Sequence, residues 1–286
     1  MKIVETVAEV REQVKAWRKE GLTVGLVPTM GYLHEGHQSL IAKACAQNDC
    51  VVVSVFVNPT QFGPNEDLES YPRDLEHDAA LCESTGAALI FHPTPEEMYP
   101  KGFCSFVDMD VLTKELCGLS RPVHFRGVCT VVSKLLHIVQ PDKAYFGEKD
   151  AQQLAVIRRM VLDLNMNVEI VGCPIVRESD SLAKSSRNTY LSPAERKAAL
   201  VLSKSIFAGK QLAEAGETDA AKLVQAMTEI IEAEPLAKID YVKVVDLMTM
   251  QQIPKLDRPF LAAIAVYIGK TRLIDNFMMQ AGGTAE

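Results

Sequence analysis

Two histidines, His34 and His37, lie three residues apart in the first connection of the chain, with Gly36 between them. The connection covers residues 28–37 and follows a short apolar segment, 22–27, that is typical of a buried strand ending at the proline. Ligands of α/β sheets bind where a parallel strand ends and the chain turns into a helix. The first turn of that helix offers unpaired backbone N–H groups and a positive partial charge to phosphate. Two imidazoles at this position could therefore contact a polyphosphate.

The histidine pair allows three interpretations. A metal site is disfavoured, because His-Glu-Gly-His lacks the spacing that puts both imidazoles of His-Glu-x-x-His on one helical face, and no third ligand is obvious. A structural pair that caps the helix is the second. Nucleotide binding, with both imidazoles on the triphosphate, is the third, and Gly31 and Gly36 would let the backbone approach the ligand closely. The residue types alone leave the last two open.

Two other polar segments have side chains suited to a nucleotide. Residues 148–150, Glu-Lys-Asp, follow an expected strand at 143–146, and residues 185–187, Ser-Ser-Arg, lie in a polar stretch over 178–192. Taken alone, a charged triplet is typical of a solvated turn and a polar stretch is typical of a linker. Their composition therefore assigns neither segment to a site.

The elements that must position these residues predict a doubly wound α/β domain. Residues 51–57 are apolar almost throughout, as in a strand covered by helices on both faces. The other expected strands lie at 22–27, 87–91, 143–146 and 168–171, and the expected helices at 4–17, from Gly36 onward, and at 74–85, 128–139 and 150–163. Alternating strands and helices are the signature of this architecture.

The pattern changes after about residue 176. Two helices are expected near 193–214 and 218–233, followed by alternating strands at 239–245, 261–268 and 271–275 that predict a small antiparallel sheet. We therefore expect a Rossmann-like domain over 1–176 and a smaller C-terminal α+β lid domain over 177–286, with the cleft between them. The small, polar tail 280–286 is expected to fray.

Composition limits the class of protein. The chain has 286 residues, 48% of them apolar, and a net charge of −7. No apolar run approaches the roughly 18 residues of a membrane span, and Glu5 and Glu9 interrupt any signal-peptide core, which predicts a cytoplasmic protein. The acidic balance excludes a general nucleic-acid binder, though not a basic pocket. The seven cysteines form no Cys-x-x-Cys pair and are expected to be buried free thiols.

The segment Gly-Tyr-Leu-His-Glu-Gly-His at 31–37 resembles the His-x-Gly-His signature of the nucleotidylyltransferase superfamily. A class I tRNA synthetase of that superfamily is excluded, because no anticodon-binding module fits after residue 176. Further segments resemble the pantothenate synthetase family and follow its order along the chain: 27–31, 56–62, 71–73, 121–128, 146–153, 185–188 and 272–276. The resemblance thus covers nearly the whole chain.

This resemblance implies that ATP drives the condensation of pantoate with β-alanine. The pantoate carboxylate attacks the α-phosphorus to give pantoyl adenylate and pyrophosphate, and the amine of β-alanine then displaces AMP. A carboxylate is already ionised near neutral pH, so the first step needs alignment and charge neutralisation rather than a base. Mg²⁺ is implied with ATP as co-substrate, with Asp78 as a candidate outer ligand. A homodimer is also implied.

By resemblance, three parts of the chain bind ATP: Met30, Gly31, Tyr32, Leu33, His34, Glu35, Gly36, His37; Gly147, Glu148, Lys149, Asp150; and Val176, Lys184, Ser185, Ser186, Arg187. The expected catalytic residues are His37, His34, Lys149, Ser185, Ser186 and Arg187. An imidazolium at His37 could protonate departing pyrophosphate. Asp150 suits the ribose hydroxyls, and Lys149 suits phosphate. The Ser-Ser-Arg segment resembles the second signature of the synthetases, a mobile loop that clamps the outer phosphates.

The resemblance also implies a pocket for the acid. Gln61 and Gln153 are expected to bind pantoate, because an amide both donates and accepts hydrogen bonds, and Gln61 is linked to β-alanine as well. Asn58, Tyr71, Arg121 and His124 are secondary candidates. His124 and Arg126, on an expected loop before the 128–139 helix, could gate the pocket.

The 180–188 segment departs from the family pattern at two positions, Ser181 and Lys184, where Gly and an apolar residue are usual. Ser181 is expected to stiffen the loop, and Lys184 adds a cation near the phosphates. Two other functions stay open: a nucleotidylyltransferase whose acceptor is a phosphate ester, and a non-catalytic nucleotide sensor. Gln61 and Gln153, in place of extra Arg or Lys, favour a less charged acceptor than a phosphate ester.

Overall fold

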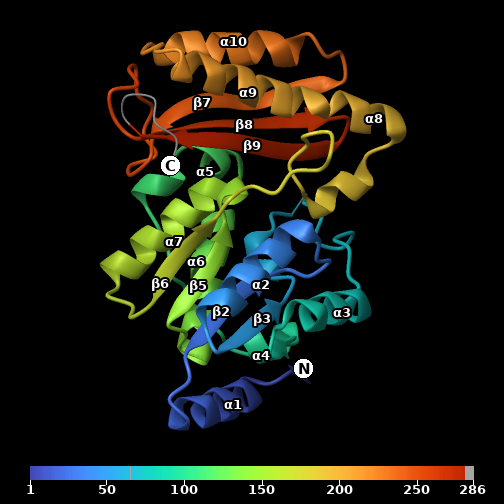
Figure 1. The fold of residues 1–286 in the computed structure, drawn as a ribbon, viewed down its shortest axis with the longest axis vertical. Coiled ribbons are helices and arrows are strands. Elements are labelled where there is room, and N and C mark those ends of the chain that lie inside the picture. Colours follow the sequence, from blue (N-terminus) through green and yellow to red (C-terminus); the bar gives the residue numbers. More distant parts are fainter. Residues whose placement is uncertain (65, 281–286) are drawn as a thin grey trace. The chain divides into compact units, whose positions relative to one another are not determined.

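A parallel sheet of six strands forms the centre of the first of two units (Figure 1). The computed structural model describes residues 1–64 and 66–280, so most of the tail expected to fray lies outside the described residues. The first unit comprises Met1–Met109, Arg121–Glu148 and Val156–Pro174. The second comprises Asp110–Ser120, Lys149–Ala155 and Ile175–Glu286. The predicted α/β class, with a smaller antiparallel sheet, is confirmed.

The strand order of the first unit is β1-β4-β3-β2-β5-β6, with every neighbouring pair parallel. The strands are β1 (Lys2–Val4), β2 (Val24–Thr29), β3 (Cys50–Val55), β4 (Leu89–Phe91), β5 (Lys143–Gly147) and β6 (Glu169–Cys173). The order reverses between β2 and β5, and ligands of doubly wound sheets bind at such a reversal. The sheet therefore places the histidine connection, which follows β2, at the expected position for a ligand.

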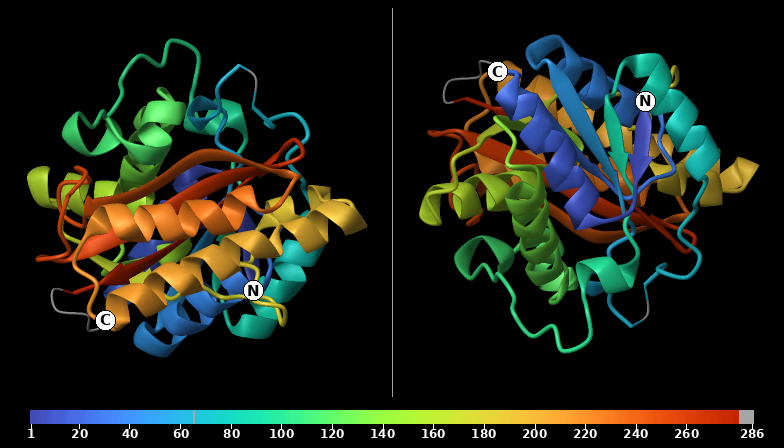
Figure 2. Two further views of the ribbon diagram at one scale, coloured as in Figure 1. Left: turned by 90° about the horizontal axis from the view of Figure 1, so that it is seen from above. Right: turned by 90° about the horizontal axis from the view of Figure 1, so that it is seen from below.

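Helices cover both faces of this sheet (Figures 1 and 2). They are α1 (Val7–Lys19), α2 (Glu35–Gln47), α3 (Leu75–Thr85), α4 (Pro95–Met98), α6 (His124–Val139) and α7 (Ala151–Asp163), which crosses from the second unit into the first. Val27, Val53 and Ile90 pack with residues of α2 and α3 in one buried cluster. The alternate strand residues Leu26, Val52 and Leu89 are equally buried, on the face against which α6 packs. This double burial explains why the strands are apolar throughout.

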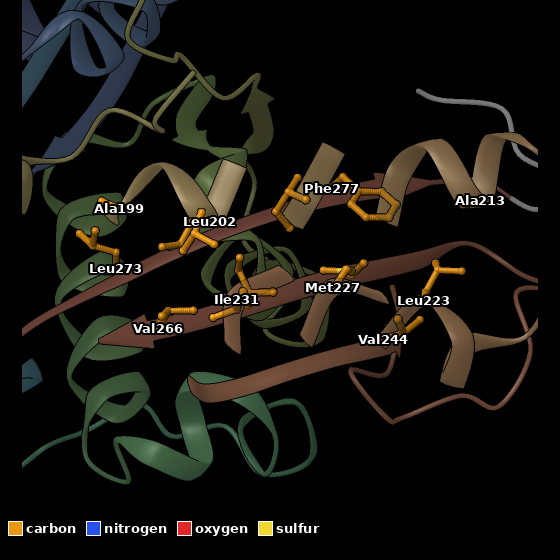
Figure 3. Close-up of a cluster of buried hydrophobic side chains, with 14 of the residues drawn as sticks. Ala199, Leu202, Ala213, Leu223, Met227, Ile231, Val244, Val266, Leu273 and Phe277 are labelled. Carbon is orange, nitrogen blue, oxygen red and sulfur yellow. The ribbon is translucent and has the colours of Figure 1, made fainter. Parts of the chain in front are cut away.

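The second unit is built on an antiparallel sheet of three strands, β7 (Ala237–Asp246), β8 (Phe260–Ile268) and β9 (Thr271–Met279). Its helices are α5 (Leu116–Ser120), α8 (Pro193–Ala198), α9 (Leu200–Glu214) and α10 (Ala220–Glu232). The last two lie side by side over the sheet and enclose an apolar core (Figures 2 and 3). At Gly209, an added Cβ would lie 2.5 Å from Met227 Sδ, so glycine allows α9 and α10 to pack closely.

Several sequence-based boundaries were wrong, and four of them change which residues lie in a helix or strand near the candidate sites or at a domain's core. Val4 belongs to β1, a strand that was not predicted, and pairs with Phe91 of β4. Helix α1 begins only after Thr6, whose side chain forms a capping box with Glu9. Pro28 continues β2 opposite Ser54. The helix expected at 128–139 begins at His124, so neither His124 nor Arg126 lies on a loop. The helix expected at 193–214 is two helices, with the break at Ala199.

The seven cysteines are all unpaired. Four are buried, two are partly exposed, and Cys104 is exposed, so the prediction of buried thiols was wrong for Cys104. Burial raises the pKa of Cys82 and of Cys129 to about 12, which keeps both as thiols near neutral pH. None of the helices within the described residues is long and apolar enough to cross a membrane.

Candidate active site

The histidine pair forms the cap of helix α2. His34 is its N-cap and accepts a hydrogen bond at Nδ1 from the Gly36 backbone N–H at 3.1 Å. His37 Nδ1 accepts in return from the His34 backbone N–H at 3.3 Å, and the two ring centroids lie 4.1 Å apart. Because each Nδ1 accepts a backbone proton, a neutral ring carries its own proton on Nε2. The pair is thus both a structural cap and two Nε2–H donors at a helix N-terminus.

The connection before the pair is held by a buried carboxylate. Gly31 and Tyr32 have φ of +83° and +51°, a region that side chains such as tyrosine rarely adopt. Asp78, 1% exposed, accepts the Tyr32 N–H at 2.9 Å and the Leu33 N–H at 2.6 Å. Burial, which outweighs these two bonds, raises the pKa of Asp78. His77 Nε2 adds a contact of 3.0 Å to the Leu33 carbonyl.

Gln61 lies in a second group of residues in the first unit. It ends the short helix η1 (Pro59–Gln61) after β3 and is 7% exposed. Its backbone carbonyl oxygen contacts His124 Nδ1 at 3.0 Å and accepts from Arg121 Nη2 at 3.4 Å. Arg121 also donates to both carboxylate oxygens of Glu66, at 2.7 and 2.6 Å. Although burial acts in the opposite direction, this guanidinium lowers the pKa of Glu66.

The close packing of α6 on η1 requires a glycine. An added Cβ at Gly127 would lie 2.4 Å from the Thr60 carbonyl oxygen and 2.6 Å from Gln61 Cα. The structure thus brings together Asn58, Gln61, Arg121 and His124. Arg126 is not part of this group, because its guanidinium lies over the Phe106 ring, 4.0 Å from the ring centroid. Tyr71 packs edge-on against Phe62, with centroids 6.1 Å apart.

In the second unit, Lys149 and Ser185 line one small cavity of about 10 Å³, together with Asn188 and Asp275. Lys149 belongs to the short helix η3 (Glu148–Asp150); its Nζ lies 3.8 Å from Asp150, and its carbonyl accepts from Asn276 Nδ2 at 2.9 Å. Gly147, which ends β5 in the first unit, would meet no described atom within 4 Å if a Cβ were added. Open space beside a glycine suits close approach of a ligand.

The Ser-Ser-Arg segment forms the start of a short helix. Ser185 caps the short helix η4 (Ser186–Tyr190), its Oγ accepting from the Arg187 N–H at 3.3 Å, and Ser186 is buried. The Lys184 N–H donates to the Val176 carbonyl at 2.9 Å. Ser181 has φ of +78°, a conformation in which glycine is favoured.

Ion pairs brace the loop between Ile175 and η4, together with backbone hydrogen bonds and the buried side chains of Leu182 and Ala183. Arg177 donates to both oxygens of Asp275, at 2.7 and 2.9 Å. Arg196 pairs with Glu178 at 3.0 Å and with Asp180 at 2.8 Å. Acidic and basic side chains of the second unit therefore hold the segment that carries the serines.

The two neighbouring glutamines on α7 differ. Gln152 is buried; its Oε1 accepts from the Cys117 N–H at 2.9 Å, and its Nε2 donates to the Leu112 and Glu115 carbonyls at 2.9 and 2.8 Å. Gln153 is partly exposed and makes no side-chain hydrogen bond to the rest of the described chain. The Gln152 amide is thus fully engaged within the protein, whereas the Gln153 amide is partly exposed.

Sequence reasoning missed several residues that shape these groups. Asp78 was predicted as a magnesium ligand and holds the backbone of the histidine connection. Tyr99, which was not predicted, donates its hydroxyl proton to Asn58 at 2.7 Å. Across residues 1–64 and 66–280, no three His, Cys, Asp or Glu side chains are arranged to hold a metal ion.

Comparison with known proteins identifies the family. The family model described as pantoate–β-alanine ligase matches residues 2–278. Pantothenate synthetase of Ruminiclostridium cellulolyticum is 68% identical over 277 residues, covering 97% of this chain and 98% of that protein. The enzyme of Enterococcus faecalis is 60% identical over 280 residues, covering 98% and 99%.

Solved structures agree with the sequence relatives. Pantothenate synthetase of Thermus thermophilus superposes with a TM-score of 0.91 at 47% identity, covering 97% of this chain and 99% of that one. Pantoate–β-alanine ligase of Francisella tularensis, in complex with β-γ ATP and β-alanine, gives a TM-score of 0.80 at 35% identity, covering 99% and 100%. The chain therefore belongs to the pantoate–β-alanine ligase family.

Proposed function

We propose that the chain joins pantoate to β-alanine by way of pantoyl adenylate, releasing pyrophosphate and AMP. The observation that carries this proposal is the histidine pair at the N-terminus of α2. Its two Nδ1 atoms bond to backbone N–H groups, so the rings are oriented as Nε2–H donors beside the positive end of a helix. The Francisella tularensis relative, described with β-γ ATP and β-alanine bound, supports these substrates.

The first step places negative charge on pyrophosphate as the pantoate carboxylate attacks. His34 and His37 donate to the phosphates through Nε2, and Lys149 and Arg187 supply positive charge. Protonating His37 at Nδ1 would remove its bond to the His34 N–H. We therefore assign His37 to stabilising the charge of the phosphates through its Nε2–H group, in preference to protonating the departing pyrophosphate. Ser185, Ser186 and the rest of the predicted C-terminal domain, residues 177–286, act as the lid on the phosphates.

The acid is assigned to Gln61 and Gln153, and β-alanine to Gln61. The Gln61 backbone is anchored by His124 and Arg121, so these two residues, together with Asn58, shape the pocket. Tyr71 is placed beside them only by its packing on Phe62. Amides suit an acceptor that bears one carboxylate and hydroxyl groups better than they suit a phosphate ester.

The metal in this proposal is Mg²⁺ carried by ATP. Both oxygens of Asp78 already accept backbone N–H groups, and the described residues contain no cluster of metal-ligating side chains. The protein residues thus do not fit a resident metal, and we assign the ion to the phosphate oxygens of its substrate and to water. We also propose a homodimer in the cytoplasm, which light scattering on the purified protein and imaging of a tagged chain would test.

Product release tests the function. Pyrophosphate should appear only when pantoate is present with MgATP, and AMP should require β-alanine in addition. Pyrophosphate release with any short acid, or with a phosphate ester in place of pantoate, would contradict the proposal. ATP binding without turnover across these acids would instead indicate a nucleotide sensor. His137→Ala, an exposed histidine of α6, is the matched control for histidine variants.

A further inference from the structure

The hydroxyl of Tyr99 makes a bond that none of the assigned roles requires. It donates to Asn58 Oδ1 at 2.7 Å, the short end of the range for neutral O–H···O bonds. Burial raises the pKa of this phenol, so it stays protonated and able to donate at neutral pH. Its ring packs against Phe103, with centroids 5.0 Å apart. Tyr99 is therefore fixed both by its ring and by its hydroxyl.

Two backbone groups, together with the Tyr99 hydroxyl, determine which way the Asn58 amide faces. The Thr60 N–H can only donate and lies 3.4 Å from Oδ1, on the same side as the Tyr99 and Thr60 hydroxyls. The Gly127 carbonyl can only accept and lies 3.2 Å from Nδ2. If the Asn58 amide were flipped, its NH₂ group would face the Thr60 N–H and its oxygen would face the Gly127 carbonyl oxygen. Asn58, which is 1% exposed, therefore has one orientation.

Asn58 in turn orients Gln61. Its Nδ2 donates to Gln61 Oε1 at 3.1 Å, so the Gln61 carbonyl oxygen is engaged on that side. The Gln61 NH₂ group contacts Met30 Sδ at 3.0 Å. A thioether is a weak acceptor, so this NH₂ group retains the capacity to donate to a stronger one. Met30 belongs to the connection that carries the histidines, where a ligand is expected.

We propose that Tyr99 is a positioning residue for the acid substrate, which acts through Asn58 to keep the NH₂ group of Gln61, and not its carbonyl, facing the acid. The pocket then selects an acid that presents a carboxylate or hydroxyl oxygen to this NH₂ group, and disfavours a compound that presents a donor there. The inference rests on the proposed assignment of Gln61 to pantoate.

Steady-state kinetics of Tyr99→Phe and Asn58→Asp test the inference. Tyr99→Phe removes one donor to Asn58, and we expect the KM for pantoate to rise roughly 5- to 10-fold with kcat and the KM for ATP within about twofold. Asn58→Asp replaces the donor to Gln61 by an acceptor, which turns the Gln61 carbonyl toward the acid. The KM for pantoate should then rise roughly 100-fold or more.

The control is Tyr145→Phe, which also removes a buried tyrosine hydroxyl bonded to an amide, that of Asn48 at 2.8 Å. It should lower the melting temperature and leave the KM for pantoate unchanged. Parallel changes in the KM values of pantoate and ATP with Tyr99→Phe, or an unchanged KM for pantoate, would overturn the inference. Gln61→Ala distinguishes failure of the positioning role of Tyr99 from failure of the assignment of Gln61 to pantoate. If it raises the KM for pantoate while the Tyr99 and Asn58 variants do not, only the positioning role fails; if it has no effect, the assignment of Gln61 fails as well.

Discussion

The two segments that we assign to the phosphates of ATP are held in place by different forces. In the first unit, the connection before His34 depends on a carboxylate that is 1% exposed and accepts two backbone N–H groups. In the second unit, the loop before Ser185 has one ion pair to a buried carboxylate, Asp275 at 1% exposed, and further pairs between partly exposed side chains, such as Arg196 and Asp180 at 26% and 41%. Buried bonds are screened little by salt, whereas exposed pairs are screened strongly.

This difference has a functional consequence. A segment held by buried bonds keeps one conformation, which suits residues that must already be aligned when ATP arrives. A segment held in part by exposed ion pairs can release those pairs at low cost, which suits a loop that clamps the phosphates after binding. We therefore expect a preorganised histidine connection and a loop whose stability depends in part on salt and pH.

The largest effect is expected at His34, where capping and phosphate binding can be separated. His34→Ala removes the cap and the Nε2–H donor, whereas His34→Asn keeps a capping oxygen and removes only the donor. Both should slow pyrophosphate formation in a single turnover by about 10³-fold. Only the alanine variant should also lose about 1 kcal/mol of unfolding free energy. Near-normal rates in the asparagine variant would show that the imidazole acts only as a cap.

The next effect concerns Asp78, on which the preorganised connection depends. Asp78→Asn keeps one acceptor and turns an NH₂ group toward a backbone N–H, so the Tyr32 and Leu33 amides cannot both be satisfied. We expect a loss of about 2 kcal/mol in denaturant unfolding and a KM for ATP raised roughly 10-fold. Glu76→Gln, an exposed residue in the same first turn of α3, is the matched control and should change neither. A normal KM for ATP in Asp78→Asn would contradict preorganisation by this carboxylate.

The sequence predicted a segment well where the residues that hold it are close together in the chain, and poorly where they are far apart. The histidine cap is local: His34, Gly36 and His37 bond to one another, so spacing alone placed them at a helix start. The Asp78 contacts span 45 and 46 residues, and the Tyr99 contact spans 41, so no local pattern could indicate them. The short strand β1 was missed for the same reason, since only pairing with β4 makes Val4 a strand residue.

A smaller effect is expected from relieving backbone strain in the second loop. Ser181 has φ of +78°, so Ser181→Gly should raise the unfolding free energy by roughly 0.5–1 kcal/mol. The comparison in the first unit is Asn165→Gly, because Asn165 has φ of +51° and asparagine tolerates this region well. Thermal unfolding of both variants is the measurement. Equal shifts in the two variants would mean that Ser181 is not specially strained.

The smallest effect tests the ion pairs of the second loop directly. The hydrogen bond from Arg196 lowers the pKa of Asp180 in the folded chain. This carboxylate therefore contributes stability above its unfolded pKa of roughly 3.9, and that contribution is lost as pH falls through the lower folded value. Arg196→Gln should lower the melting temperature by a few degrees at most at pH 7, because exposed pairs contribute little.

The deficit of Arg196→Gln should shrink in 1 M salt and below about pH 3.5, where the Asp180 carboxylate begins to be protonated. Lys114→Gln, which breaks a more exposed pair with Asp110 in the second unit, is the control and should have no measurable effect. A deficit in Arg196→Gln that is independent of salt and pH would mean that the arginine acts by packing. The two phosphate-binding segments would then be held by the same kind of force, and the distinction between a preorganised site and an adjustable clamp would not hold.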